Sequence, residues 1–310
     1  SPPPSAPAAA RWTLGDALGL LVWPAIVWWP LYMTNAGGYA RHFEAGWWEP
    51  GAGSAVWGVA ALRDYPSPLG LTLGLLAVAA GMVPVVIYHA LRVRGVLGRA
   101  TPIERDGVPK YDFWEGVLTH VSQPEGFLLL GGYLVGTWML RIMPASYYTY
   151  DAGINWWHVA AQLLLQDLFQ YGMHLAEHRV NKAFYRVSHK PHHVFTNPRI
   201  FDAFNGSLLD TFFMILVPLA LTAQIVPANV WSYMTFGTLY ANWLTLIHSE
   251  FSHAWDPAFR AIGFGTAGDH HVHHKVFKYN FGHTFMYWDR AFGTYRDPRE
   301  VRAFNGDKAI

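Results

Sequence analysis

Long stretches without charged side chains dominate the hydrophobic pattern of this chain. Ala17–Ala40, Tyr65–Leu91 and Thr211–Ser249 contain no Asp, Glu, Lys or Arg. A helix that crosses a membrane needs about 20 apolar residues, so the longest stretch is predicted to form two spans with a turn at Pro227–Asn229. Two shorter uncharged stretches are Gly126–Leu140 and Ala152–Gln166. Together they predict an all-α, integral membrane helical bundle of about four to six hydrophobic helices.

The basic residues between these stretches predict the orientation in the membrane. Residues 92–125 and 179–199 each carry several Lys or Arg, whereas 41–64 and 141–157 carry few. Loops rich in Lys and Arg stay on the cytoplasmic side. Three segments are therefore expected there, as a cap on the helix ends: 92–125, 174–207 and 248–310.

Composition narrows the function. Apolar residues make up 52% of the 310 residues and charged residues 14%, against about 25% charged in an ordinary soluble domain. The net charge of +1 gives no reason to expect a nucleic-acid partner. The chain has no cysteine and 16 histidines. Disulfides and thiolate metal sites are therefore excluded, and a transition-metal site must use imidazole and carboxylate groups.

Three histidine clusters predict a metal centre. The first has the spacing HxxxH and the other two HxxHH; their members are His174 and His178, then His189, His192 and His193, then His270, His273 and His274. On a helix these spacings place the imidazoles on one face, as ligands of one metal centre require. Imidazole suits iron and zinc. Eight such ligands are too many for one ion, so we predict two metal ions.

The clusters and their surroundings resemble the sterol desaturase/fatty acid hydroxylase superfamily. The resemblance covers about residues 160–298 and rests on DLFQYGMHLAEHRVNKAFYRVSHKPHH, IHSEF and HHVHHKVFKYNFGHTFMYWDRAFGTYRDP. The closing segment is most similar to that of sterol C5-desaturases, through Asn280, Gly282, Trp288, Asp289, Phe292, Gly293 and Thr294. Asp202 and Asn205 stand where sterol C5-desaturases carry histidines.

The resemblance implies a membrane-bound, O2-dependent di-iron oxidoreductase that hydroxylates or desaturates a lipid. Sterol-like, fatty acyl and isoprenoid substrates all stay open. The implied cofactors are two iron ions, which zinc can replace during purification, and O2. Electrons would come from a separate protein, cytochrome b5-like or of the ferredoxin/reductase type. The chain then divides into a flexible N-terminus (1–12), N-terminal transmembrane helices (13–150) and the histidine-box domain (151–310).

A ninth ligand is predicted from topology. His248 ends the last uncharged stretch, which returns to the side where the three boxes lie, and the superfamily has a histidine at this position. The predicted metal and catalytic set is therefore His174, His178, His189, His192, His193, His248, His270, His273 and His274. Side chains expected to orient these ligands are Asp167, Glu177, Asp202, Asp269 and Asn280. The lipid is expected to enter from the bilayer between 212–221 and 231–246.

Two other functions compete with lipid oxidation. A zinc-dependent membrane hydrolase would use three protein ligands and a general base, commonly as HExxH, and the chain has no HExxH. A metal-handling membrane protein would place its ionisable groups within the spans rather than at their ends. The remaining histidines are expected to be packing or interfacial (His42, His89, His120 and His158) or to lie beside the ligands (His253, His271 and His283). Trp288–Arg290 is expected to be a structural lock.

Overall fold

Helices make up most of the secondary structure. The computed structural model describes residues 68–98, 100–122, 133, 137, 140, 142–149 and 152–305. The predicted N-terminus (1–12), the predicted span Ala17–Ala40 and most of Gly126–Leu140 lie outside these residues. The division into three parts therefore stays a prediction.

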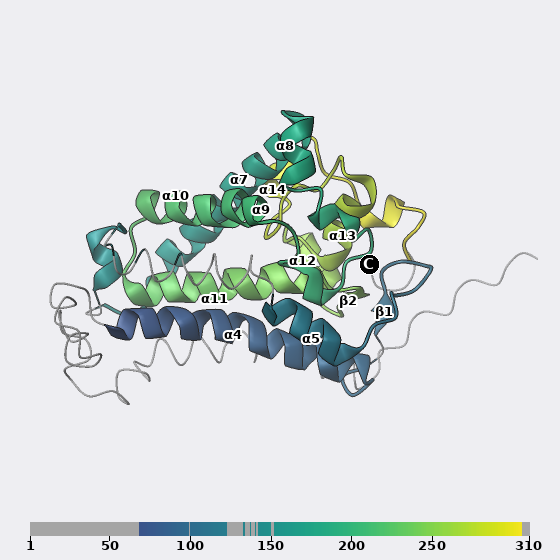
Figure 1. Ribbon diagram of the computed structural model, residues 1–310, viewed down its shortest axis with the longest axis horizontal. Helices are drawn as coiled ribbons and strands as arrows, with labels where there is room; N and C mark the ends of the chain where they lie inside the picture. The colour runs from purple at the N-terminus through teal and green to yellow at the C-terminus, as the bar shows by residue number, and fades with distance from the viewer. Residues whose placement is uncertain are drawn as a thin grey trace, which may run out of the picture.

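Ten α-helices lie in the described residues: α4 (Pro68–Val93), α5 (Phe113–Ser122), α7 (Trp156–Arg179), α8 (Lys182–Val187), α9 (Leu208–Thr211), α10 (Val217–Ile225), α11 (Val230–Leu246), α12 (Asp256–Ala261), α13 (Ala267–Val276) and α14 (Tyr287–Ala291). Short 3-10 turns are η4 (Ala145–Tyr148), η5 (His192–Val194), η6 (Ile200–Asp202) and η8 (Pro298–Glu300). A π-helical turn, η7 (Phe212–Leu216), joins α9 to α10. The helices α4, α10 and α11 run along the long axis of the molecule, away from the α10–α11 turn (Figure 1). The opposite end, which contains α12 and α13, is called the polar end.

The longest uncharged stretch forms two helical arms, as predicted. Leu208–Ile225 is the first arm, α11 is the second, and the chain turns between Val226 and Asn229. The side chain of Asn229 begins α11 by accepting a hydrogen bond from the backbone N–H of Ser232 at 2.9 Å, which satisfies one of the free N–H groups of a first turn. The turn predicted at Pro227–Asn229 is therefore confirmed.

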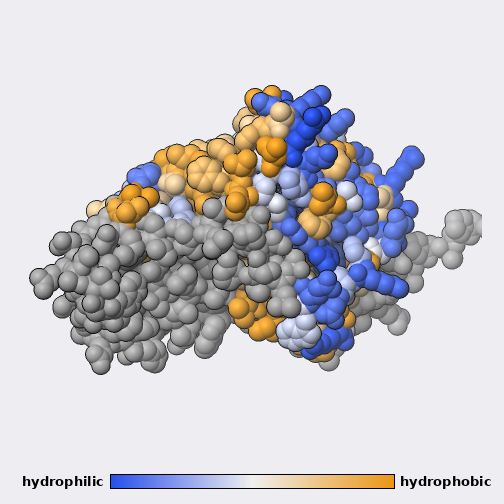
Figure 2. Space-filling view, in the orientation of Figure 1, coloured by the Kyte–Doolittle hydropathy of each residue, from blue (hydrophilic) through white to orange (hydrophobic). Residues whose placement is uncertain are grey.

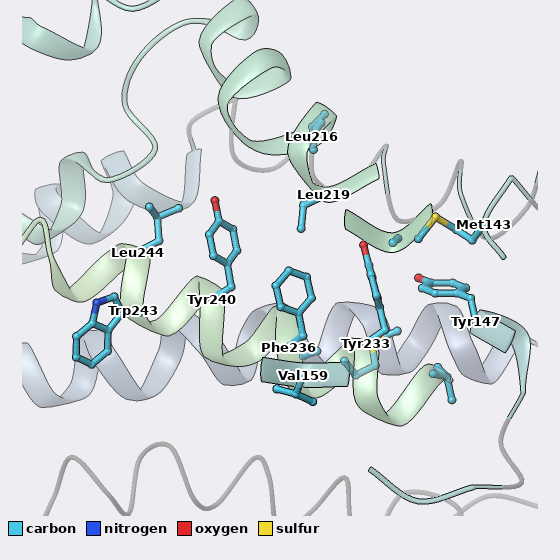
Figure 3. Close-up of a cluster of buried hydrophobic side chains, with 14 of the residues drawn as sticks. Met143, Tyr147, Val159, Leu216, Leu219, Tyr233, Phe236, Tyr240, Trp243 and Leu244 are labelled. Carbon is cyan, nitrogen blue, oxygen red and sulfur yellow. The ribbon is translucent and has the colours of Figure 1, made fainter. Parts of the chain in front are cut away.

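The core lies between α11 and the helices around it. Figure 3 shows Phe236 and Tyr240 of α11 pointing toward Leu216 and Leu219 at the α10 side. On its other side α11 packs along α4 (Figure 1). The hydroxyl of Thr238 donates to the carbonyl oxygen of Ala77 across that contact, at 3.2 Å. Two neighbours thus hold α11, whose last residues lead to His248.

A polar stripe follows one face of α7. Gln162, Gln166, Gln170 and His174 recur every fourth residue, so they share a face. All four are almost completely buried. The stripe bonds to the core helices: Tyr240 Oη donates to Gln170 Oε1 at 3.1 Å, and Gln162 Nε2 donates to the carbonyl of Val226 at 3.0 Å. These hydrogen bonds fix the rotation of α7 about its axis. His174 lies on the same face and therefore points into the interior.

One described helix is long and apolar enough to cross a membrane. It is the arm Leu208–Ile225, and length and composition are the criteria it meets. Large apolar side chains are exposed along it, among them Phe212, Leu221 and Ile225. Figure 2 shows this apolar surface over α9 and α10 and a polar surface over the end with α13. The number of membrane spans and the cytoplasmic position of the polar end stay predictions.

A minimal sheet is a departure from the all-α prediction. β1 (Thr101–Pro102) pairs antiparallel with β2 (Phe251–Ser252). The backbone N–H of Ile103 continues the pairing by donating to the carbonyl of Glu250 at 3.0 Å. The sheet ties the segment before α5 to the segment that follows His248. The sheet therefore joins two segments that lie far apart in the sequence.

The close contact between α4 and α11 generates a stability prediction. A Cβ on Gly81 would lie 2.9 Å from Cβ of Ala241 and 3.1 Å from the carbonyl oxygen of Thr238. We expect Gly81→Leu to lower the stability by about 1–3 kcal/mol, because overpacking forces the helices apart. Thermal denaturation in detergent measures this. Gly172→Leu is the matched control, since nothing lies within 4 Å of a Cβ there. Equal melting temperatures for the two variants would contradict the packing argument.

Candidate metal centre

Nine histidine side chains form two adjoining groups. The first histidine group is His174, His178, His189, His193 and His273, and the second is His192, His248, His270 and His274. Within each group, one ring nitrogen per residue lies within 4.8 Å of the others. The structure thus brings together all nine predicted ligands, including His248. That they bind metal stays a prediction.

The second and third boxes divide between the groups. Each was expected to serve one centre, but His189 and His193 join the first group while His192 joins the second. On α13, His270 and His274 are one turn apart and share the second group, whereas His273 faces the first. Successive helical residues point about 100° apart, because a turn holds 3.6 residues. A pair of adjacent histidines therefore reaches two centres from one backbone.

The hydrogen bonds of the first group leave nitrogen lone pairs facing each other. His174 and His189 donate from Nδ1 to the carbonyl oxygen of Phe281 and to Oδ1 of Asp210, both at 2.8 Å. A neutral imidazole has one N–H, so Nε2 of each ring then carries a lone pair. These two Nε2 atoms are 2.9 Å apart. At that distance the lone pairs repel unless a cation lies between them. Burial lowers the pKa of His189, but the Asp210 carboxylate raises it by more, so a proton on His189 can serve this one pair.

The second group repeats this arrangement. His248 donates from Nδ1 to the carbonyl oxygen of Leu244 at 2.7 Å, and His192 donates to that of Asn205 at 3.0 Å. Their Nε2 atoms are 3.4 Å apart. Nε2 of His270 lies 2.9 Å from that of His248. Ligand imidazoles in metal sites are typically oriented by such an outer hydrogen bond from the other ring nitrogen.

At the other eight rings, protons are poor candidates for such a cation, because every one of them has a lowered pKa. Burial, together with the neighbouring imidazoles, lowers the pKa of His193 and His273 well below the usual range. The same causes lower the pKa of His178, at the edge of the first group, to about 3. Neutral imidazoles with converging Nε2 atoms are a donor set for a first-row transition metal such as iron or zinc. The residues present therefore fit two metal ions, one in each group.

Two carboxylates support the first group through His189. Asp210 accepts its Nδ1–H, and Oε2 of Glu177 lies 3.5 Å from the same nitrogen. The hydroxyl of Ser188 donates to the other Glu177 oxygen at 2.6 Å. Burial raises the pKa of Glu177 to about 7. A carboxylate behind an imidazole raises its basicity as a ligand, so this pair strengthens the metal-directed nitrogen of His189.

The other predicted supporting residues bond elsewhere. Asp202 accepts three hydrogen bonds from Arg199, two from its guanidinium group and one from its backbone N–H, so the buried carboxylate is used by an ion pair. Asp269 accepts from Arg260 and begins α13 as a capping box with Thr266. Asn280 donates to the carbonyl of Asp269 at 2.9 Å. Asp269 and Asn280 thus hold the backbone that carries the third box, whereas Asp202 holds the turn η6.

The loop Phe281–Thr284 is clamped by two buried carboxylates. Asp289 accepts hydrogen bonds from the backbone N–H groups of Phe281 and Gly282, at 2.8 and 2.7 Å. Asp167 does the same for His283 and Thr284, at 3.1 and 2.7 Å. The predicted lock at Trp288–Arg290 thus acts through Asp289. The clamp also fixes the Phe281 carbonyl that orients His174.

The chain is similar to known proteins over the region that carries the boxes. Residues 159–294 match the Fatty acid hydroxylase family. The chain is 52% identical over 285 residues to a protein named "Alternative squalene epoxidase" from Phaeodactylum tricornutum, covering 90% of this chain and 80% of that protein. The chain belongs to the sterol desaturase/fatty acid hydroxylase superfamily. No solved structure matches it.

Two further members of the superfamily have names that describe an action on sterols. The "Delta(7)-sterol-C5(6)-desaturase" of Nicotiana tabacum is 30% identical over 148 residues, which is 47% of this chain and 52% of that protein. The "Lathosterol oxidase" of Homo sapiens is 30% identical over 141 residues, 44% of either chain. This chain spans about half the length of these two relatives. The names support oxidation of lipids as the activity of this superfamily member.

The remaining histidines of this superfamily member lie outside both groups. His253 stacks on Trp255 and bonds to Tyr88 at 3.1 Å. His271 donates to the carbonyl of Ala267 within α13. His89 and His120 are buried rather than interfacial, and His158 lies in the first turn of α7. His42 lies outside the described residues. Among these histidines in the described residues, only His283 lies against both groups.

Asp210 is the functional residue that the sequence analysis missed. It stands directly before the longest uncharged stretch, in α9, and its carboxylate reaches His189 across a separation of 21 residues. The carbonyl groups of Phe281, Asn205 and Leu244 were missed as well, because a backbone acceptor can occur on any residue type. The one available signal for Asp210 was an acidic residue at the edge of an apolar segment.

The lowered histidine pKa values predict acid sensitivity of the metal-free protein. The unfolded chain binds these protons near pH 6.5, whereas folded His178 binds its proton only near pH 3. More protons are therefore bound in the unfolded state between these values, and stability falls as the pH falls. Five groups with raised pKa values oppose this: the carboxyl groups of Asp167, Glu177, Asp256 and Asp289, through burial, and His189, through Asp210. The imidazoles with lowered pKa values are more numerous.

We expect the melting temperature of the metal-free protein to fall steadily between pH 7 and pH 5. Each such histidine contributes up to about 1.4 kcal/mol per pH unit. Thermal denaturation of chelator-treated protein at a series of pH values measures the slope. His178→Gln should reduce it, because that position then binds no proton in the unfolded state. A melting temperature that is constant over this range would contradict the prediction.

Proposed function

We propose that the chain is a membrane-bound, O2-dependent oxidoreductase that oxidises a lipid at a dinuclear iron centre. The observation that carries this proposal is the pair of adjoining groups whose Nε2 lone pairs face one another, as in the neutral rings of His192 and His248 at 3.4 Å. Two irons, when bound, supply the oxidising power that no amino-acid side chain has. The residues of the chain hold the ions, keep the ligands neutral and exclude bulk water through burial.

We further propose that the substrate is a long polyene of the squalene type. This rests on the relative named squalene epoxidase, which matches 90% of this chain at 52% identity. The balanced reaction is alkene + O2 + 2 electrons + 2 protons → epoxide + water. One oxygen atom bridges the two carbons of the double bond and the other leaves as water. The sequence analysis anticipated attack on a C–H bond, and the sterol-acting relatives keep that chemistry as the second candidate.

The substrate route is proposed to begin in the bilayer. The arm Leu208–Ile225 exposes Leu209, Phe212 and Leu221, which is the surface that lipid tails would solvate. Leu216, Leu219 and Phe236 face one another between this arm and α11 (Figure 3). An apolar chain could replace those contacts at little cost in free energy. In this arrangement the polar end with the histidine groups is the cytoplasmic cap.

Metal content and product formation test the proposed function together. We expect two irons per chain in carefully purified protein, and conversion of squalene to its epoxide when O2 and a reductant are supplied. A Δ7-sterol offered in the same assay tests the second candidate. His248→Ala should reduce iron to about one per chain and abolish turnover, because it removes one of four ligands of the second group. His253→Ala, outside both groups, should retain both irons.

The outcomes separate the parts of this proposal. One metal or none in the wild-type protein would refute the dinuclear centre. Two irons without oxidation of either lipid would refute the substrate class alone. Full iron content and near-normal turnover in His248→Ala would show that this histidine is a packing residue.

Electrons are proposed to enter beside His178 from a separate acidic carrier protein. A half-open pocket of about 430 Å³ is lined there by His178, Arg179, Phe277, Lys278, Tyr279 and Phe281. Arg179 and Lys278 are exposed cations on its rim. The Phe281 ring lies 5.4 Å from that of His178, and the Phe277 ring 4.9 Å from that of His193. The pocket therefore combines a basic rim with a short path to the first group.

Charge reversal tests this docking surface. We expect Arg179→Glu/Lys278→Glu to slow reduction of the iron-loaded protein by an acidic cytochrome b5 domain at least tenfold at low salt, because steering by opposite charges is lost. Stopped-flow absorbance measures the rate. Dithionite, a small reductant, should reduce the double variant as fast as the wild type. Arg302→Glu is a control on a cation outside this pocket. Equal rates for the wild type and the double variant would place donor docking elsewhere.

A further inference from the structure

His283 lies against both histidine groups and belongs to neither. Its ring centroid is 5.1 Å from that of His174 in the first group and 5.1 Å from that of His270 in the second. The residue is 5% exposed. Its ring nitrogens nevertheless fall outside the sets in which all ligand atoms lie within 4.8 Å of one another. The imidazole is therefore beside the junction of the two groups without being a member of either ligand set.

The backbone holds His283 rigidly in this place. Asp167 on α7 accepts the N–H groups of His283 and Thr284, and the carbonyl of Thr284 accepts the N–H of Gly265 at 2.9 Å. Neither neighbouring glycine has room for a side chain. A Cβ on Gly265 would collide with the His283 carbonyl, and a Cβ on Gly282 with that of Phe285. Such support is typical of a side chain whose position matters for function.

The imidazole has unused hydrogen-bonding capacity. Nδ1 of His283 is buried and has no hydrogen-bond partner among the described residues. A buried polar atom without a partner destabilises the folded state, and such atoms in native structures call for an explanation such as a bound water or ion. His271 and His253 also have one unpartnered ring nitrogen each, Nε2, but their rings lie against Phe304 and Trp255 rather than against both histidine groups.

We propose that His283 hydrogen-bonds a small exogenous ligand, such as water, azide or O2, held at the junction of the two groups. The nine imidazoles supply protein ligands from their own groups, whereas His283 faces both groups from outside them. It would act as a positioning residue that orients a small molecule toward the two metal ions. This inference rests on the proposed dinuclear centre and adds a residue that the histidine boxes do not contain.

Azide is the probe that tests this role without turnover. The iron-loaded, oxidised protein is titrated with azide, and binding is followed by the change in its visible absorption. We expect His283→Leu to weaken azide binding about fivefold to tenfold, because leucine fills a similar volume but supplies no hydrogen bond. His283→Gln should stay within about twofold of the wild type, because its amide restores a donor and an acceptor. His253→Gln is the control at a buried histidine outside both groups.

The iron content of every variant decides between the possible results. Two irons in all variants, with weaker azide binding in His283→Leu and rescue in His283→Gln, support the proposal. Equal azide affinity in all three proteins overturns it while leaving the dinuclear centre intact. Loss of iron in His283→Leu also overturns it, because the residue would then hold the metal. A wild-type protein with two irons and no azide binding would overturn the role of His283 and leave the dinuclear centre in place, whereas one iron or none would refute the centre itself.

Discussion

Repulsion between imidazole lone pairs is the constraint on which the polar end of this molecule depends. Outer hydrogen bonds hold Nδ1–H of His192 and His248 outward, so their Nε2 atoms face each other at 3.4 Å. Burial keeps protons away from both rings by lowering their pKa values. We infer that metal ions among the nitrogens relieve this repulsion. Metal binding and folding of this end should be one coupled process, since the ligand set does not exist in the unfolded chain.

The apolar helices form a frame that supports the polar end. The two long helices that lead to the histidine groups are fixed along their length, away from the histidines. The glutamine stripe fixes α7, and packing on α4 at Gly81 fixes α11. Ligands then emerge where the helices end, in His174 and His248. The short elements α13 and the loop Phe281–Thr284 are held by carboxylates instead. Long-range packing thus sets the position of the centre, and local hydrogen bonds set its orientation.

The sequence predicted the parts of the site that depend on side-chain identity. Histidine spacing identified eight of the nine members of the two groups, and topology, together with the histidine that the superfamily has at this position, suggested His248. The division of His192 from His193 was not predicted, because it depends on the rotation of a 3-10 turn rather than on spacing. Asp202 and Asp269 were expected near the imidazoles but pair with arginines. Proximity in sequence does not reveal which of several partners a carboxylate selects.

The features of the site that could not be predicted from the sequence share one physical cause. The acceptors for Nδ1 of His174, His192 and His248 are backbone carbonyls, which every residue type possesses. Their placement is encoded indirectly, by the groups that fix the backbone, such as Asp289 beneath Phe281. A substitution at such a supporting residue should therefore disturb metal binding without touching a ligand. The same reasoning explains His283: its position is set by Asp167 and by two glycines that leave no space for a side chain, not by any spacing among the histidines.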